Sequence, residues 1–173
     1  MPHPLKLHPD CRCDAVREIA VEATRPEPAA LRLRYRVSGA VAGLLVPAPA
    51  SPSRTDGLWQ HTCFEAFLRA GAGESYYEYN FAPSTEWAAY AFTSYRSEMR
   101  IIADAALSIE LTQSETALDL TAEIHDLPAE TPWRVALSAV MEERNGRRSY
   151  WALAHPKGKP DFHHSDCFAL ELP

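Results

Sequence analysis

The chain has 173 residues, of which 46% are hydrophobic and 23% are charged, values ordinary for a globular domain with an apolar core. Its 17 basic and 23 acidic side chains give a formal net charge of −6, and no basic run exceeds Arg147-Arg148. Nucleic acids and anionic membranes are therefore not expected as partners, because both attract a positive surface. The N-terminus lacks the pattern of a secretory signal, and no apolar run approaches the ~20 residues of a membrane span. We expect a cytoplasmic protein of one domain, 1–173, whose oligomeric state the sequence leaves open.

Apolar and polar side chains alternate along most of the chain from Val16 to Leu172, which is typical of β-strands. Outside the aromatic region described next, strands are expected at 16–24, 31–38, 99–102, 107–112, 117–124, 134–142, 149–154 and 167–172. The dipeptide Asn145-Gly146 predicts a hairpin turn. Proline and serine in 46–57 prevent regular pairing and predict a long loop, which is either functional or mobile. The best candidate for a short helix is Ser94 to Ala106.

This pattern predicts an all-β protein. We expect an antiparallel β-sandwich, jelly-roll-like, with about ten strands and at most one or two short helices. The last strand should bury Phe168, Leu170 and Leu172 together.

The segment from Asp56 to Arg96 combines this alternation with many aromatic side chains, and it reads as three consecutive strands. In the first strand, one face is predicted to carry Trp59, His61, Cys63, Glu65 and Phe67. In the second, Tyr77, Tyr79 and Phe81 should lie on one face and Tyr76, Glu78 and Asn80 on the other. Such a polar and aromatic face can line a cup for a small polar ligand, or it can be the solvated face of an ordinary sheet.

The sequence contains none of three common functional motifs, namely the GxSxG elbow, the P-loop and GxGxxG. Cys63 and His61 would stand parallel on one strand, a poor geometry for proton transfer. Glu65 and Glu78 can meet across neighbouring strands as a carboxylate pair, which is compatible with glycoside chemistry and also with two solvated carboxylates. Catalysis is therefore the minority interpretation, and a hydrolase is the least favoured function.

Histidines gather in the C-terminal part of the chain, where His155, His163 and His164 share one loop. Together with His61 they are candidate ligands for a metal or a haem iron. Their spacing matches no zinc motif, and histidines in a Pro/Gly-rich loop more often bond to backbone groups or face water. No cofactor is predicted, and haem is the alternative.

Three separated segments agree in order with a known family: WQHTCFEAFL, YYEYNFAPSTEWAAYAF and YWALAHPKGKPDFHHSDCFALEL. The chain resembles the DOMON-like domains, which are β-sandwiches related to family 9 carbohydrate-binding modules. The resemblance implies a non-catalytic module for a sugar or a haem. Its haem-binding members use a Met and a His as axial ligands, for which Met99 and Met141 are candidates by residue type.

From these residues we expect a binding site for a saccharide or a sugar-containing metabolite. Tryptophans would stack on the ligand, carboxylate and amide groups would hydrogen-bond its edge, an arginine would donate, and histidines would close the rim. The predicted ligand-binding residues are Trp59, His61, Glu65, Asn80, Arg96, Trp151, His155, His163 and His164. A haem- or metal-binding electron carrier that uses the loop histidines is the alternative.

Overall fold

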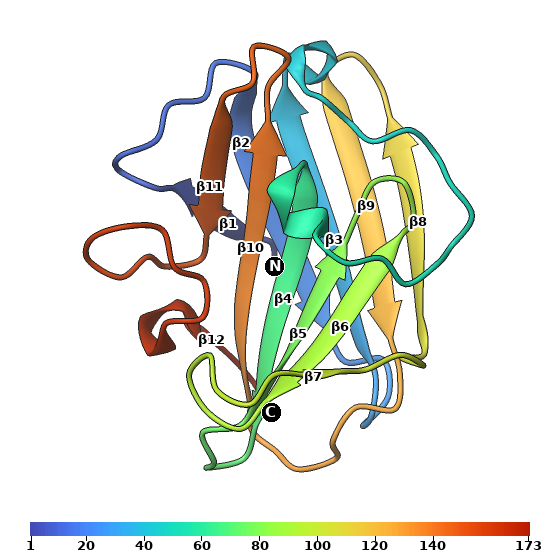
Figure 1. Ribbon diagram of the computed structural model, residues 1–173, viewed down its shortest axis with the longest axis vertical. Coiled ribbons are helices and arrows are strands. Elements are labelled where there is room, and N and C mark those ends of the chain that lie inside the picture. The colour runs from blue at the N-terminus through green and yellow to red at the C-terminus, as the bar shows by residue number, and fades with distance from the viewer.

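The computed structural model describes all residues 1–173 and contains twelve strands (Figure 1). Wherever two of these strands pair, they run antiparallel. The strands are β1 (His3–Leu7), β2 (Val16–Thr24), β3 (Leu31–Gly39), β4 (Cys63–Ala70), β5 (Tyr76–Phe81), β6 (Trp87–Phe92), β7 (Arg100–Ile101), β8 (Leu107–Gln113), β9 (Ala117–Ile124), β10 (Trp133–Glu142), β11 (Arg148–Ala152) and β12 (Leu170–Leu172). The helices are three 3-10 turns, η1 (Val41–Gly43), η2 (Leu58–Gln60) and η3 (Ser165–Cys167). Each of these turns has three residues, far fewer than a membrane-spanning helix needs. The expectation of an all-β antiparallel fold is confirmed.

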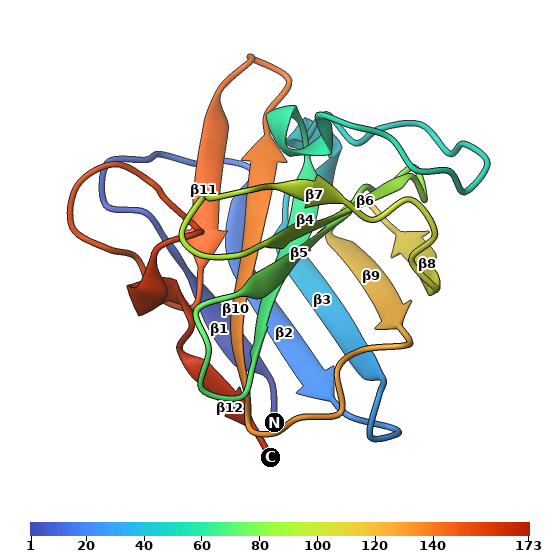
Figure 2. The ribbon, with the colours of Figure 1, turned by 60° about the horizontal axis from the view of Figure 1, so that its bottom comes forward.

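The strands form one sheet in the order β7-β6-β5-β4-β10-β11-β1-β2-β3-β9-β8, with β12 beside β10. Strand β1 pairs with both β2 and β11, so it joins the half that contains β4 to the half that contains β3. The sheet curls until these halves face each other (Figure 2). The expected sandwich of two separate sheets in jelly-roll order is thus not confirmed. The twelve strands also exceed the expected number of about ten. The short β1 escaped prediction because Pro2 and Pro4 flank and interrupt it.

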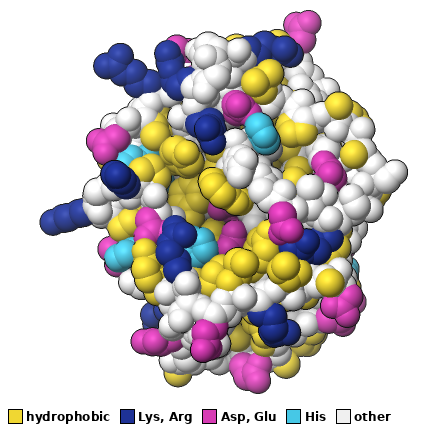
Figure 3. All heavy atoms as spheres, in the orientation of Figure 1, with side chains coloured by type: hydrophobic (Ala, Val, Ile, Leu, Met, Phe, Trp, Pro, Cys, Tyr) yellow, Lys and Arg dark blue, Asp and Glu magenta, His cyan; other side chains and the backbone are white.

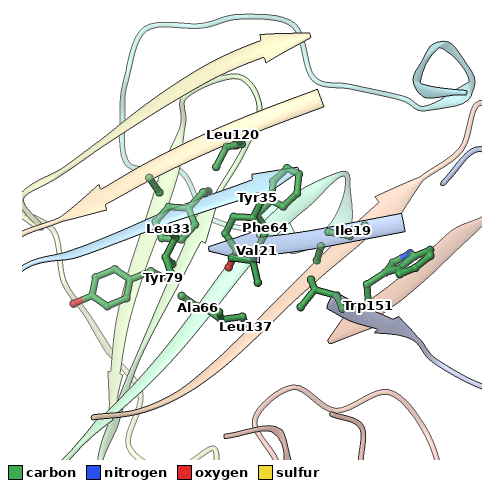
Figure 4. Close-up of a cluster of buried hydrophobic side chains, with 14 of the residues drawn as sticks. Ile19, Val21, Leu33, Tyr35, Phe64, Ala66, Tyr79, Leu120, Leu137 and Trp151 are labelled. Atoms are coloured by element: carbon green, nitrogen blue, oxygen red, sulfur yellow. The ribbon is translucent and has the colours of Figure 1, made fainter. Parts of the chain in front are cut away.

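An apolar core fills the space between the two halves (Figure 4). Ile19, Val21 and Leu33 enter it from one half, and Phe64 and Leu137 enter it from the other. Tyr35 also lies in this core, where its ring packs 4.9 Å from the ring of Phe64 and its hydroxyl donates 2.8 Å to the backbone oxygen of Glu65. The buried hydroxyl is thereby satisfied, and the core side of β4 is fixed.

Two local expectations are wrong. Residues 94–106 form no helix; they make a turn followed by β7, with positive φ angles at Arg96 (50°) and Glu98 (48°). The last strand contains only 170–172, and Phe168, Leu170 and Leu172 are half-buried. Strand β12 pairs with β10 at Trp133 to Val135, beyond the segment where β11 pairs with β10. The Asn145-Gly146 turn between β10 and β11 is confirmed.

The two halves differ on their outer faces. On the half that contains β3, the outward side chains form ion pairs such as Arg34 with Asp119, and this face is solvated. The half that contains β4 instead carries a second apolar cluster, which includes Phe67, Tyr76 and Phe92 and is partly covered by three loops. This covered face positions the candidate site.

Candidate functional site

A cleft of about 740 Å³ opens on the outer face of β4, β5, β6, β10 and β11. Its walls come from the end of the Pro-rich loop with η2, from residues 93–99 and from residues 153–169. Figure 3 shows this hollow from the side of Figure 1, with apolar side chains inside and charged side chains and histidine around it. A volume of this size suits a small-molecule ligand.

Strand alternation supplies the floor of the cleft. In β4, Phe64 and Ala66 point into the core, whereas Glu65 and Phe67 point into the cleft. In β5 the same alternation sends Glu78 outward. The register pairs Glu65 with Asn80 and Phe67 with Glu78, so the two glutamates are diagonal neighbours on adjacent strands.

Both glutamates are nearly inaccessible to solvent, with exposed fractions of 3% for Glu65 and 7% for Glu78. Ser138 donates its hydroxyl to Oε2 of Glu65 at 3.3 Å, and the amide of Asn80 donates to Oε1 of Glu78 at 2.9 Å. The second oxygen of each carboxyl, Oε1 of Glu65 and Oε2 of Glu78, has no hydrogen bond within the protein. The floor therefore offers two free carboxyl oxygens to a ligand.

Burial makes these carboxyl groups hard to ionise. Desolvation, followed by the charge of Glu78, raises the pKa of Glu65 to about 8. Desolvation likewise raises the pKa of Glu78, although the hydrogen bond from Asn80 opposes this rise. At pH 7 Glu65 is mainly a neutral carboxylic acid, which can donate one hydrogen bond as well as accept others.

His163 closes one end of the floor. Its ring packs edge-on against Phe67 at 5.0 Å and Phe92 at 5.2 Å. Its Nδ1 lies 2.8 Å from the hydroxyl of Tyr76, which also accepts the backbone N–H of Arg96. We assign the hydroxyl proton to this bond with Nδ1, which leaves the Nε2 proton directed toward Oε2 of Glu78 at 3.6 Å. Desolvation and then the charge of Arg96 lower the pKa of His163 to about 4, so the imidazole is neutral.

The Pro-rich loop is held against the edge of β6. The backbone of Trp87 donates to Ser53 at 3.0 Å and accepts from Thr55 at 2.8 Å. Asp56 then accepts the hydroxyl of Tyr90 at 2.6 Å. These bonds place η2, with Trp59 half exposed at 51%, on the rim of the cleft.

The other two wall loops are tied to each other. Asp161 accepts a hydrogen bond from Arg96 at 2.9 Å and another from the Tyr95 hydroxyl at 2.7 Å. Its Oδ1 also accepts the backbone N–H of His163 at 3.2 Å. Arg96 has a left-handed backbone (φ 50°), a conformation that costs energy for a non-glycine residue and is offset here by its bonds to Asp161 and Tyr76.

Of the predicted ligand-binding residues, the structure brings four to the cleft: Trp59, Glu65, Arg96 and His163. Asn80 is buried beneath it and positions Glu78. The predicted face of the first strand is correct only from Cys63 onward, because Trp59 belongs to η2 and His61 precedes the strand.

The other four lie elsewhere. His61 is exposed, and its Nδ1 lies 2.7 Å from Oε2 of Glu142. Trp151 belongs to the main core, where its indole N–H donates to Ser149. His155 donates through Nε2 to the backbone oxygen of Lys6 at 2.8 Å. His164 uses Nδ1 to accept the N–H of Asp166 and caps η3.

Several cleft residues were missing from the predicted set: Phe67, Glu78, Tyr90, Phe92, Tyr150 and Phe162. The alternation already placed Glu78 on one face with Asn80, and that was a usable signal. Tyr150 stands beside Trp151 on β11, and a strand turns neighbouring side chains to opposite faces. The tyrosine, and not the tryptophan, therefore reaches the cleft.

The alternative of haem or metal ligation can be tested on these residues. No group of three or more His, Cys, Asp or Glu side chains is arranged to hold a metal ion. Met141 is buried in the core, whereas Met99 and His163 both line the cleft. They fit a haem poorly, because the ring of His163 is packed among aromatic side chains and two buried carboxyl groups would face the apolar macrocycle.

No family model matches the sequence, and no curated protein matches it. Among solved structures, the fold is similar to the crystal structure of a "putative carbohydrate-binding protein" from Bacteroides uniformis ATCC 8492, with a TM-score of 0.67 and 10% sequence identity. The alignment covers 96% of this chain and 83% of that chain. At this identity the similarity establishes a shared fold and nothing finer.

Proposed function

We propose that the cleft binds a saccharide or a sugar-containing metabolite without chemically changing it, as a module of the DOMON-like and family 9 carbohydrate-binding type. The observation that carries this proposal is a concave site with aromatic walls and two carboxyl groups on its floor. Aromatic rings pack against the apolar faces of a sugar ring, and carboxyl oxygens bond to its hydroxyl groups. The similarity in fold to the Bacteroides uniformis protein supports the proposal.

The placement of the carboxyl groups favours binding over hydrolysis. Glycosidases place two carboxyl groups on either side of the scissile bond. Here Glu65 and Glu78 rise from neighbouring strands of one floor, so they face the same side of a ligand. A thiol mechanism is also disfavoured, since burial raises the pKa of Cys63 and His61 lies outside the cleft.

Trp59 is the clearest test of this proposal, because its exposed ring stands on the rim and contributes little to the core. Calorimetric titration with a panel of neutral and charged oligosaccharides should detect binding, and Trp59→Ala should raise Kd by roughly five- to tenfold. Leu45→Ala is the matched control, since Leu45 is also partly exposed but does not line the cleft. The absence of wild-type binding at millimolar sugar, or equal effects of the two substitutions, would contradict the proposal.

A further inference from the structure

The two floor carboxyl groups lack a direct ion pair within the protein, although the charge of Arg96 opposes the rise that desolvation causes in the pKa of both. Neither Glu65 nor Glu78 forms an ion pair with a lysine or an arginine. The nearest titratable base is His163, whose imidazole is neutral. Buried carboxyl groups are normally paired. Glu65 and Glu78 lack such a partner, and a bound ligand can supply it.

The other charged groups that face the cleft are already occupied or lie at its edge. The guanidinium of Arg96 is held by Asp161, and Asp56 is held by Arg54. Lys159 is exposed in the C-terminal wall loop. The carboxyl groups of the cleft that lack a direct ion pair are thus the two on the floor.

Aromatic rings surround this floor. Phe67 comes from β4, Tyr90 and Phe92 come from β6, and Tyr150 and Phe162 come from β11 and the C-terminal loop. Aromatic faces attract an organic cation, and the attraction increases where water is excluded. Two carboxyl groups inside an aromatic enclosure form a suitable environment for an ammonium group.

We propose that the cleft selects a saccharide that carries a protonated amino group, which seats between Oε1 of Glu65 and Oε2 of Glu78. This inference rests on the proposed saccharide-binding function and specifies its ligand class. An ammonium group has three N–H donors and one positive charge, so it can donate to both free oxygens and compensate one ionised carboxylate. A neutral hydroxyl group supplies one donor and no charge, so it does not favour ionisation of either carboxyl group.

Ionic pairing with the ligand requires Glu65 to give up its proton. Since the pKa of Glu65 is about 8 in the free protein, the carboxyl is mainly protonated at pH 7 and becomes ionised in the complex. At about pH 6 the amino group of the free ligand is already protonated, so only Glu65 changes its protonation state and binding should release about one proton per ligand. A neutral sugar should release almost none.

The test compares two probes that differ in charge: glucosamine oligomers and N-acetylglucosamine oligomers of equal length, two to four sugars. Calorimetric titration at pH 6 in phosphate and in bis-Tris, two buffers of different ionisation enthalpy, measures both affinity and proton release. We expect the amino form to bind at least about tenfold more tightly than the acetylated form, with proton release for the amino form alone. The double substitution Glu65→Gln with Glu78→Gln should bring the affinity ratio close to one.

The outcomes separate this inference from the proposed function. Equal or weaker binding of the amino form, or a preference that persists in the double variant, would overturn the inference and leave saccharide binding intact. Binding of neither probe, nor of any other sugar in the panel, would overturn both. Proton release by the wild-type protein needs no variant, so the test holds even where the double substitution disturbs folding.

Discussion

Replacing Glu65 by glutamine should stabilise the protein, and the gain should grow with pH. Glutamine keeps the shape and the hydrogen-bonding capacity of the protonated acid but cannot ionise. In the folded protein the pKa of Glu65 is about 8, compared with 4.5 for an ordinary glutamate. The fold therefore favours the protonated form, and the wild-type protein loses stability relative to the variant as pH rises from 4.5 to about 8.

The size of the effect follows from the pKa difference. Each unit corresponds to about 1.4 kcal/mol, so the variant should gain roughly 3–5 kcal/mol at pH 9 and less than about 1 kcal/mol at pH 5. Urea unfolding of both proteins at pH 5, 7 and 9 measures the difference. Glu74→Gln is the control, because Glu74 is exposed in the turn before β5 and forms no ion pair. A gain that does not change with pH, or a Glu65→Gln variant that resembles the control, would refute the argument from burial.

Three further predictions concern the residues around the floor. His163→Ala should lower the free energy of unfolding by about 2–4 kcal/mol at pH 7, because its ring packs among aromatic side chains. His164→Ala should lower the free energy of unfolding by less than about 1 kcal/mol, and urea unfolding measures both changes. Since the pKa of His163 is lowered to about 4, the wild-type protein loses stability as pH falls from 6.5 toward 4, and the deficit of His163→Ala should narrow over that range. Trp151→Ala should lower stability by about 3–5 kcal/mol, because the ring lies in the core, while Tyr150→Ala should mainly weaken ligand binding in calorimetry. A deficit for His163→Ala that does not depend on pH, or a normally stable Trp151→Ala, would contradict these assignments.

Strand alternation was the most predictive property of the sequence. It placed β2 at 16–24 and β9 at 117–124 with the bounds that the structure shows, and it placed Glu65 and Phe67 on one face of β4. It was wrong at the start of β4, because the alternation was expected from Trp59 and the strand begins at Cys63. A period of two continues only while the backbone is extended, and the 3-10 turn η2 ends it before Cys63.

The cleft itself was harder to predict, because its walls are loops. The Pro-rich loop is fixed by backbone bonds to Trp87, and Asp161 ties two distant loops together. Neither contact leaves a periodic signal in the sequence. Whether the polar face of β4 was solvated or enclosed depended on these contacts, so the raised pKa of Glu65 could not be read from the residue pattern.

The position of Glu65 connects the stability of the fold with the properties of the site. Its backbone oxygen accepts the Tyr35 hydroxyl from the core, while its side chain lines the cleft on the opposite face. The floor is therefore held by paired strands and a filled core, and little conformational entropy needs to be lost there on binding. A buried carboxyl group that weakens the fold above pH 4.5 contributes nothing to packing that glutamine could not supply. Its chemical difference from glutamine is the capacity to carry a negative charge, which has a use in this cleft when a ligand brings the positive one.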